Sequence, residues 1–386
     1  MTVNKLLTIN ANIVSGEGSL KDLPKYIKNK GFKYPAIIVD KNLYDNSRYV
    51  SDLINDLVVN SDMLFFYDYP FEPSYQYLDN MMVKIRKNNL DMIIDLWIGV
   101  GGGSTMDTAK GLAILCKNKG TSIKYKGFPE KLISPIPTIA VPSTTGTGSE
   151  IVYNASFIDE KTKIKMGINY KYNYPILAIL DPLIPSSAPK KVLESSGCDT
   201  LVHALEAFVS VKTNIHVQHF SKLAINLTLE NMKLILEGNG DINNWENMQW
   251  ASVYAMFALS NSTAGPSGAL SYYLGTNFKV NHGIAGGAFI GKLCKYNHEN
   301  GYYGLSSVYD RSNVHTLNIK QKSEIIVNDI LELLDLAKIP TRLDCFGVRS
   351  SDLKGFNEFA IRSSEAFNYN PIKIDLDRVS NLFVKI

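Results

Sequence analysis

Four short, continuous apolar runs stand out in the first half of the chain. They span residues 35–39, 92–100, 136–141 and 176–180, and Asp181 and Pro182 close the last one. Continuous rather than alternating apolar residues are typical of strands covered on both faces, as in a parallel sheet. Amphipathic patterns over 50–59 and 77–87 lie between the first two runs and predict helices. The order strand, helix, strand predicts a doubly wound, Rossmann-like α/β fold.

The pattern changes after Pro182. Apolar residues at three- and four-residue spacing predict a second, all-α half, with helices over 189–211, 216–237, 244–262, 284–296 and 320–337. At 386 residues the chain is long enough for two cores. We therefore expect two domains, an α/β domain over residues 1–182 and a helical domain over residues 183–386.

Composition and charge narrow the classes of function. The chain carries 40 basic and 37 acidic residues, a net charge of +3 with no polybasic run, so nothing points to nucleic acid. The run at 92–100 is interrupted by Asp95 and is too short to span a bilayer. The four cysteines form no CxxC pair and the first residues, Met1–Lys5, carry no export signal. These features predict reduced thiols and a cytoplasmic protein without membrane or nucleic-acid partners.

A run of glycines is the strongest single motif. Gly101, Gly102 and Gly103, followed by Ser104, stand between the second apolar run and a predicted helix. Glycine permits a tight turn and lets the backbone approach a ligand, and the helix start that follows suits a pyrophosphate. Ser104 or Thr105 could cap the helix or donate a hydroxyl. The motif predicts a nucleotide site, although its spacing is not Gly-x-Gly-x-x-Gly.

Two further polar positions follow predicted strands. The loop after the third strand, residues 142–150, is rich in hydroxyl-bearing residues and glycine. Its sequence is Pro-Ser-Thr-Thr-Gly-Thr-Gly-Ser-Glu. Because ligands bind at the carboxyl ends of strands in such sheets, this loop also suits a nucleotide, with a plain solvated loop as the alternative. Asp40 ends the first strand and could accept a hydrogen bond from a ribose 2′-hydroxyl, which would favour NAD over NADP; a simple turn residue is the alternative.

A carboxylate and two histidines form a candidate metal site. Asp199 and His203 are four residues apart, which places both on one face of a helix. His282 precedes a later apolar helix. Such residues could bind Fe²⁺ or Zn²⁺. The alternative is that Asp199 and His203 only form a hydrogen bond with each other on the helix, and that His282, as a lone histidine, has a structural role.

Taken together and in this order, the motifs resemble those of the iron-containing (group III) alcohol dehydrogenases. Gly16–Ser19 and Asp181–Pro182 match that family as well, and the resemblance extends to about residue 295. Within the family, residues 270–275 and 282–285 are most similar to the 3-deoxy-octulosonate 8-oxidase branch, and the phosphonoacetaldehyde reductase branch is another near relative. Both branches use anionic substrates.

The resemblance implies a cleft that holds NAD(P) and a metal between a Rossmann-like domain and a helical metal- and substrate-binding domain. The resemblance implies that the glycine turn holds the pyrophosphate, that Thr144 and Thr147 line the adenine and ribose, and that Lys165 contacts the nicotinamide ribose. The full set of expected nucleotide residues is Asp40, Gly101, Gly102, Gly103, Ser104, Asp107, Ser143, Thr144, Thr147 and Lys165. The family holds its metal with one aspartate and three histidines, and Asp199, His203 and His282 match three of these positions.

The chain departs from the family at the fourth metal ligand. Gly268 stands where the spacing to His282 places a histidine, and Tyr272 replaces a second family histidine four residues later. Three protein ligands are enough for a catalytic metal with one open position, but a glycine offers no side chain to compensate for the lost imidazole.

We therefore expect a homodimeric NAD(P)-dependent alcohol or aldehyde oxidoreductase that acts on a small, anionic or sugar-derived substrate. A metal would polarise the substrate oxygen, and His203, His282 and Tyr272 are the candidate catalytic residues. Three alternatives remain open: a metal-independent reductase that uses one of these side chains as its acid, a non-catalytic nucleotide-binding relative, and the cyclase chemistry of the dehydroquinate synthase superfamily.

Overall fold

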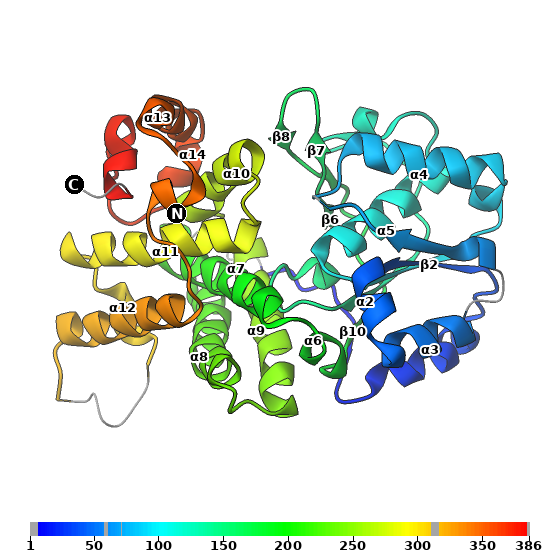
Figure 1. The fold of residues 1–386 in the computed structure, drawn as a ribbon, viewed down its shortest axis with the longest axis horizontal. Coiled ribbons are helices and arrows are strands. Elements are labelled where there is room, and N and C mark those ends of the chain that lie inside the picture. Colours follow the sequence, from blue (N-terminus) through cyan, green and yellow to red (C-terminus); the bar gives the residue numbers. More distant parts are fainter. Residues whose placement is uncertain (1–6, 58–60, 71, 310–315, 384–386) are drawn as a thin grey trace. The chain divides into compact units, whose positions relative to one another are not determined.

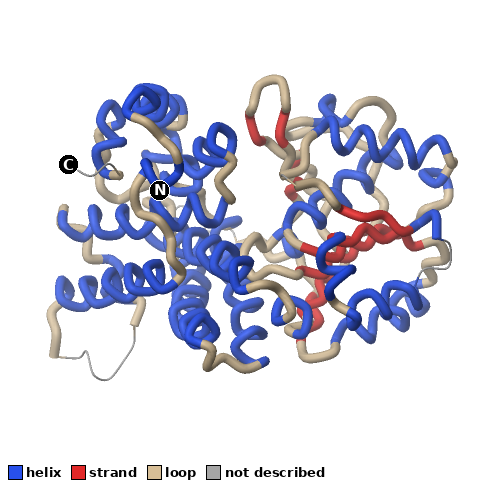
Figure 2. The backbone as a smooth tube through the Cα atoms, viewed as in Figure 1, coloured by secondary structure: helices blue, strands red, loops and turns tan. Residues whose placement is uncertain are grey.

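The computed structural model describes residues 7–57, 61–70, 72–309 and 316–383. Contacts divide the chain into two compact units, one spanning Asn10–Ala188 and the other running from Pro189 onward together with the described residues before Asn10. The first contains strands and helices, and the second contains only helices among its described residues (Figures 1 and 2). The predicted α/β and helical halves are confirmed. Within the described ranges, no helix is long and apolar enough to cross a membrane.

The first unit is built on a six-stranded parallel sheet with the order β1-β10-β5-β4-β2-β3. Its strands are β1 (Ile13–Ser15), β2 (Pro35–Asp40), β3 (Leu64–Tyr67), β4 (Leu96–Gly101), β5 (Thr138–Pro142) and β10 (Leu177–Leu180). Its helices are α1 (Leu23–Lys30), α2 (Lys41–Asn46), α3 (Arg48–Leu57), α4 (Tyr75–Lys87), α5 (Gly103–Lys117) and α6 (Leu183–Ser186). The predicted strand over 92–100 begins only at Leu96, because a 3-10 helix, Leu90–Met92, precedes it. Of the helix predicted over 50–59, residues 58 and 59 lie outside the described residues.

Strand β2 shows why the apolar runs are continuous. Ala36 and Ile38 pack in one cluster with residues of α4 and α5, whereas Ile37 and Val39 pack in another with residues of α1 and α3. All four side chains are buried. Because successive residues of a strand face opposite sides of the sheet, helices on both faces require apolar residues at every position.

The order of the strands places a crevice next to the predicted nucleotide motifs. From β2 the chain passes to β3 on one side and returns to β4 on the other side of β2. Such a reversal opens a ligand crevice beyond the carboxyl ends of the two strands. Asp40 is the last residue of β2, and Gly101 is the last residue of β4. The two motifs therefore meet at the switch point of the sheet.

Two small antiparallel pairs accompany the sheet and were not predicted. They consist of β6 (Asn154–Ala155) with β9 (Ile168–Asn169), and β7 (Ile158–Asp159) with β8 (Ile164–Lys165). Strand β8 carries Lys165.

The second unit packs its helices around α7. Its helices are α7 (Lys190–Val209), α8 (Ile215–Glu237), α9 (Ile242–Ser260), α10 (Pro266–Phe278), α11 (His282–Glu299), α12 (Ile319–Leu336), α13 (Leu353–Arg362) and α14 (Ser364–Phe367). Helices α8, α9 and α11 pack against α7, and its buried residues continue around most of its circumference. A helix that is buried around most of its circumference is typical of the centre of a helical domain.

Helix α11 approaches α7 closely because glycines line the contact. A Cβ on Gly283 would lie 2.0 Å from the carbonyl oxygen of Ser195, and one on Gly287 would lie 3.2 Å from the Cβ of Cys198. No larger residue at Gly283 would allow this approach. The first turn of α11, which begins at His282, is thereby held against α7, which carries Asp199 and His203.

Candidate active site

The packing of the glycine turn requires glycine. A Cβ on Gly101 would lie 2.6 Å from the Oγ1 of Thr105 and 3.0 Å from the Cβ of Asp40. A Cβ on Gly103 would lie 2.8 Å from the Oγ1 of Thr147. Both carbon–oxygen distances are shorter than a van der Waals contact, so a side chain at either position would force neighbouring atoms to shift. The turn therefore packs directly against the end of β2 and against the threonine-rich loop.

The start of α5 lacks the side-chain cap that the sequence suggested. Gly102 is the N-cap, and no side chain in the described part of the chain caps the helix. The expectation that Ser104 or Thr105 caps it is wrong, because the helix begins at Gly103 and both residues lie inside its first turn. An uncapped helix start can donate its first N–H groups to an anion.

The threonine-rich loop lies beside the glycine turn. The N–H of Ser143 donates to the carbonyl oxygen of Gly101 at 2.9 Å, which continues the pairing of β5 with β4. The Cγ2 of Thr144 would be 3.4 Å from a Cβ on Gly102. Thr147 likewise lies against Gly103. The structure therefore brings the two predicted loops and Asp40 together at the carboxyl ends of the strands.

Asp107 is engaged by protein groups rather than presented to solvent. Its Oδ1 accepts from the Oγ of Ser149 at 2.5 Å and lies 2.9 Å from the Nζ of Lys110, and its Oδ2 accepts from the N–H of Ser156 at 2.9 Å. Lys110 is only 1% exposed and also donates to the carbonyl oxygens of Ser149, Val152 and Asn154. The buried pair thus fixes the segment after the threonine-rich loop. Lys110 was not predicted as a site residue, although its three-residue spacing from Asp107 indicates that the two charges can pair.

Two other predicted nucleotide residues have protein partners. The Oδ1 of Asp40 accepts from the N–H of Leu43 at 2.9 Å and caps α2, so Asp40 is a turn residue as well as a neighbour of Gly101. The Nζ of Lys165 forms an ion pair with the Oε1 of Glu72 at 2.7 Å. Sequence reasoning gave no role to Glu72.

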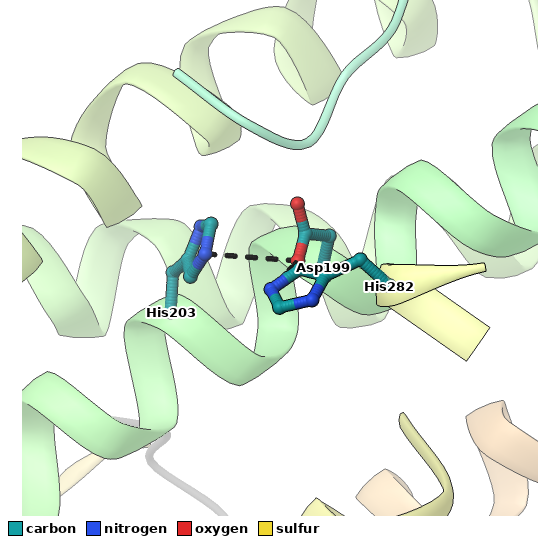
Figure 3. A group of neighbouring side chains, drawn as sticks. All are labelled: Asp199, His203 and His282. Carbon is teal, nitrogen blue, oxygen red and sulfur yellow. Dashed lines mark ion pairs between the residues drawn. The ribbon is translucent and has the colours of Figure 1, made fainter. Parts of the chain in front are cut away.

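Asp199, His203 and His282 come together in the second unit (Figure 3). One ligand atom from each lies within 4.8 Å of the others. The Oδ1 of Asp199 is 3.6 Å from the Nε2 of His203 and 3.9 Å from the Nε2 of His282. These separations are too long for hydrogen bonds, but they suit donor atoms that share one ion at about 2 Å. One carboxylate oxygen and two imidazole nitrogens are a donor set that fits Zn²⁺ or Fe²⁺.

Glu206 does not supply the missing fourth ligand. A Cβ on Gly268 would lie 3.1 Å from the Oε2 of Glu206, so this buried carboxylate adjoins the position. Its oxygens accept the N–H groups of Gly265, Ser267 and Gly268 at 2.8, 2.5 and 3.0 Å. Burial raises the pKa of Glu206, and these hydrogen bonds counteract part of that rise. The carboxylate therefore caps the start of α10, a role that only the fold reveals.

Two neighbours hold the ring of His282. The ring of Tyr272 packs against it with centroids 5.0 Å apart and an angle of 32° between the planes. The Oγ of Ser271 lies 2.9 Å from the Nδ1 of His282 and donates to the carbonyl oxygen of Gly268 at 2.6 Å. Tyr272 was a predicted site residue. Ser271 was not, because a serine within a helix carries no signal of its own.

Comparisons with known proteins give concordant matches over most of the chain. Residues 10–182 match the model of the family described as iron-containing alcohol dehydrogenase, and residues 194–386 match that of the C-terminal part of the Fe-containing alcohol dehydrogenase family. The chain is 30% identical to 1,3-propanediol dehydrogenase of Citrobacter freundii over 301 residues, 77% of this chain and 76% of that protein.

Solved structures share the fold. A 1,3-propanediol oxidoreductase aligns with a TM-score of 0.86 at 23% identity and covers 99% of both chains. Sulfoacetaldehyde reductase from Bifidobacterium kashiwanohense, in complex with NAD⁺, aligns with a TM-score of 0.82 at 21% identity and covers 99% of this chain and 98% of that chain.

Proposed function

Because the chain belongs to the iron-containing alcohol dehydrogenase family, we propose that it interconverts a small alcohol and its aldehyde, on a substrate that is anionic or sugar-derived. Family membership makes the chain an NAD(P)-dependent oxidoreductase and implies a divalent metal, so the proposal concerns its substrate and its residues. The observation that carries the alcohol–aldehyde interconversion is the convergence of Asp199, His203 and His282.

On the nucleotide side, the start of α5 and the turn Gly101–Ser104 hold the pyrophosphate of NAD(P). Thr144 and Thr147 line the adenine and its ribose, and Lys165 contacts the nicotinamide ribose. Asp40 accepts from the adenosine 2′-hydroxyl, which favours NAD, because a 2′-phosphate would meet a carboxylate. The support is the position of Asp40 against the glycine turn, with 3.0 Å between its Cβ and a Cβ built on Gly101. Ser143, whose N–H donates to the carbonyl oxygen of Gly101, and Asp107, which pairs with Lys110, complete the proposed set of nucleotide residues.

On the metal side, Asp199, His203 and His282 would hold a divalent ion. When bound, such an ion would supply Lewis-acid polarisation of the substrate oxygen. Tyr272, whose ring packs against His282, is the candidate to donate a hydrogen bond or a proton to the substrate oxygen.

The substrate class rests on local similarity. Residues 270–275 and 282–285 resemble the branch that acts on an eight-carbon sugar acid, and the branch that acts on phosphonoacetaldehyde is another near relative. The same fold occurs in a sulfoacetaldehyde reductase, so the architecture accommodates an anionic aldehyde.

The test is a comparison of kcat/KM for reduction of sulfoacetaldehyde, phosphonoacetaldehyde and uncharged propionaldehyde, with NADH and with NADPH. We expect the preferred anionic aldehyde to exceed propionaldehyde by about tenfold or more, the effect of about 1.4 kcal/mol in transition-state binding. A preference for propionaldehyde would reject the anionic class and leave the oxidoreductase assignment intact.

A metal-independent reductase is the second candidate, and Gly268 is the observation that favours it. The discriminating measurement is turnover after anaerobic chelation, with residual Fe and Zn quantified in the same sample. We expect turnover to fall with metal content and to return when Zn²⁺ or Fe²⁺ is added. Full turnover in metal-free protein would select the candidate in which His203, His282 or Tyr272 acts as the acid without a metal.

The homodimeric state and cytoplasmic location stay predictions. Light scattering on the purified protein tests the first, for which we expect twice the 43.0 kDa mass of the chain.

A further inference from the structure

We propose that Ser271 is a positioning residue of the metal centre that fixes the tautomer and orientation of His282. The inference rests on the proposed metal role of Asp199, His203 and His282. It concerns a residue of α10, the helix from which Gly268 supplies no ligand.

The hydrogen bonds of Ser271 determine which nitrogen of His282 carries the proton. The Ser271 hydroxyl is fully buried and donates its single hydrogen to the carbonyl oxygen of Gly268 at 2.6 Å. Toward the Nδ1 of His282, 2.9 Å away, the same oxygen can therefore only accept. Nδ1 is then the protonated nitrogen of a neutral imidazole, and Nε2 keeps its lone pair.

The atom left with the lone pair is the one that faces the other ligands. The Nε2 of His282 lies 3.9 Å from the Oδ1 of Asp199. In the opposite tautomer Nε2 would carry a hydrogen and could not bind a metal. That tautomer would also draw the hydroxyl hydrogen of Ser271 away from Gly268. The buried hydrogen bonds thus select the ligand-competent form of His282.

The same bonds connect the two helices that carry the ligands. Gly268 donates its N–H to the Oε1 of Glu206 on α7 at 3.0 Å, and its carbonyl oxygen accepts from Ser271, which in turn accepts from His282 on α11. The packing of Tyr272 against the ring of His282 adds a second constraint on its orientation. Helix α10 therefore contributes orientation to the site. Hydrogen bonds to ligating histidines of this kind typically change metal affinity by about 10- to 100-fold.

The experiment compares the Zn²⁺ affinity of the full-length protein with that of S271A by competition with a chromophoric chelator. The matched control is S267A, because Ser267 lies on the same helix, is equally buried and has an Oγ with no hydrogen-bond partner among the described residues. We expect S271A to bind Zn²⁺ about 10- to 100-fold more weakly and S267A to bind it as the wild type does. Equal affinity in S271A and S267A would overturn the inference.

A double-mutant cycle separates positioning from loss of structure. If Ser271 acts through His282, removing it from H282A should cost no further Zn²⁺ affinity. An equal loss in both backgrounds would indicate a merely structural role and overturn the inference. Should S271A not fold, S271C replaces it, because a thiol keeps the volume but accepts hydrogen bonds weakly. Wild-type protein that binds no Zn²⁺ or Fe²⁺ would instead overturn the proposed ligand set on which the inference stands.

Discussion

Gly268 stands where the resemblance to the family places a fourth metal ligand, and a single substitution tests what the absence of that ligand does. In G268H, the new Cβ would lie 3.1 Å from the Oε2 of Glu206 and 3.8 Å from the Cβ of Ala264, so the carboxylate must shift by a few tenths of an ångström. We expect Zn²⁺ affinity to rise by about tenfold or more, about 1.4 kcal/mol, because the imidazole restores a fourth protein ligand. Chelator competition measures the change.

The control for this substitution is G268A, which adds the same Cβ without a donor atom. We expect no gain in Zn²⁺ affinity from G268A. If G268H binds Zn²⁺ no more tightly than G268A, residue 268 does not face the proposed metal centre.

Glu150 provides a prediction on pH dependence. It is 2% exposed, and burial raises its pKa from 4.5 to about 7. Between these values the folded chain holds one proton more than the unfolded chain, so the free energy of unfolding falls as pH rises through this window. We expect wild type to lose about 3 kcal/mol more than E150Q between pH 4.5 and pH 7.5. Urea unfolding at both pH values measures this difference.

The comparison variant for E150Q is E130Q, which removes an exposed carboxylate from the same unit. It should keep the pH dependence of the wild type. Should E150Q lose as much stability as the wild type over this range, Glu150 does not titrate as its burial implies.

Single residues also mark how far the sequence could predict the site. Asp199 and His203 were found because their spacing fixes them on one helical face, whatever the rest of the fold does. Glu206 and Ser271 were not given roles, because both act through contacts with other helices. Glu206 contacts the first turn of α10, which lies 59 to 62 residues away in the chain. Ser271 contacts the ring of His282, which lies 11 residues away. No local pattern encodes such contacts.

At the scale of elements, helix α5 depends on an ion pair within its own buried face. In K110M, Asp107 would lose its cation, and the carbonyl oxygens of Val152 and Asn154 would lose a donor. We expect a loss of about 3–5 kcal/mol in the free energy of unfolding, because removing one partner leaves a buried charge unpaired. Urea unfolding measures this loss of stability.

The control is K41M, which breaks the exposed pair with Asp45 and should cost less than about 1 kcal/mol. A similar small loss in K110M would show that the buried pair contributes little.

The elements that the sequence predicted are those with a strong, continuous pattern. Strand β2 is apolar at every buried position because helices cover both faces of the sheet. Strand β1 is three residues long and has no buried residue, so no apolar run identifies it. Helix α10 was not predicted, because Gly268, Ser271 and Gly275 interrupt its apolar spacing. It is nevertheless the element that holds His282.

At the scale of the whole molecule, the two compact units divide the proposed binding residues between them. The nucleotide residues from Asp40 to Lys165 lie in the unit Asn10–Ala188, and the three metal ligands lie in the unit that begins at Pro189. This division was visible in the sequence as a change from strand-like runs to helical spacing. Each kind of binding can therefore be removed without the other.

The last prediction uses this division. In G103V, a Cβ alone would lie 2.8 Å from the Oγ1 and Cγ2 of Thr147, so the turn must open. We expect NADH affinity to fall by about tenfold or more, about 1.4 kcal/mol, and Zn²⁺ affinity to stay unchanged, because every proposed metal ligand lies in the other unit. D199N should do the opposite: it removes a ligand charge and lowers Zn²⁺ affinity while NADH still binds. Fluorescence titration with NADH and chelator competition measure the two affinities in each variant. Loss of both affinities in G103V would mean that the turn is required for the fold of the whole chain, rather than for the nucleotide alone.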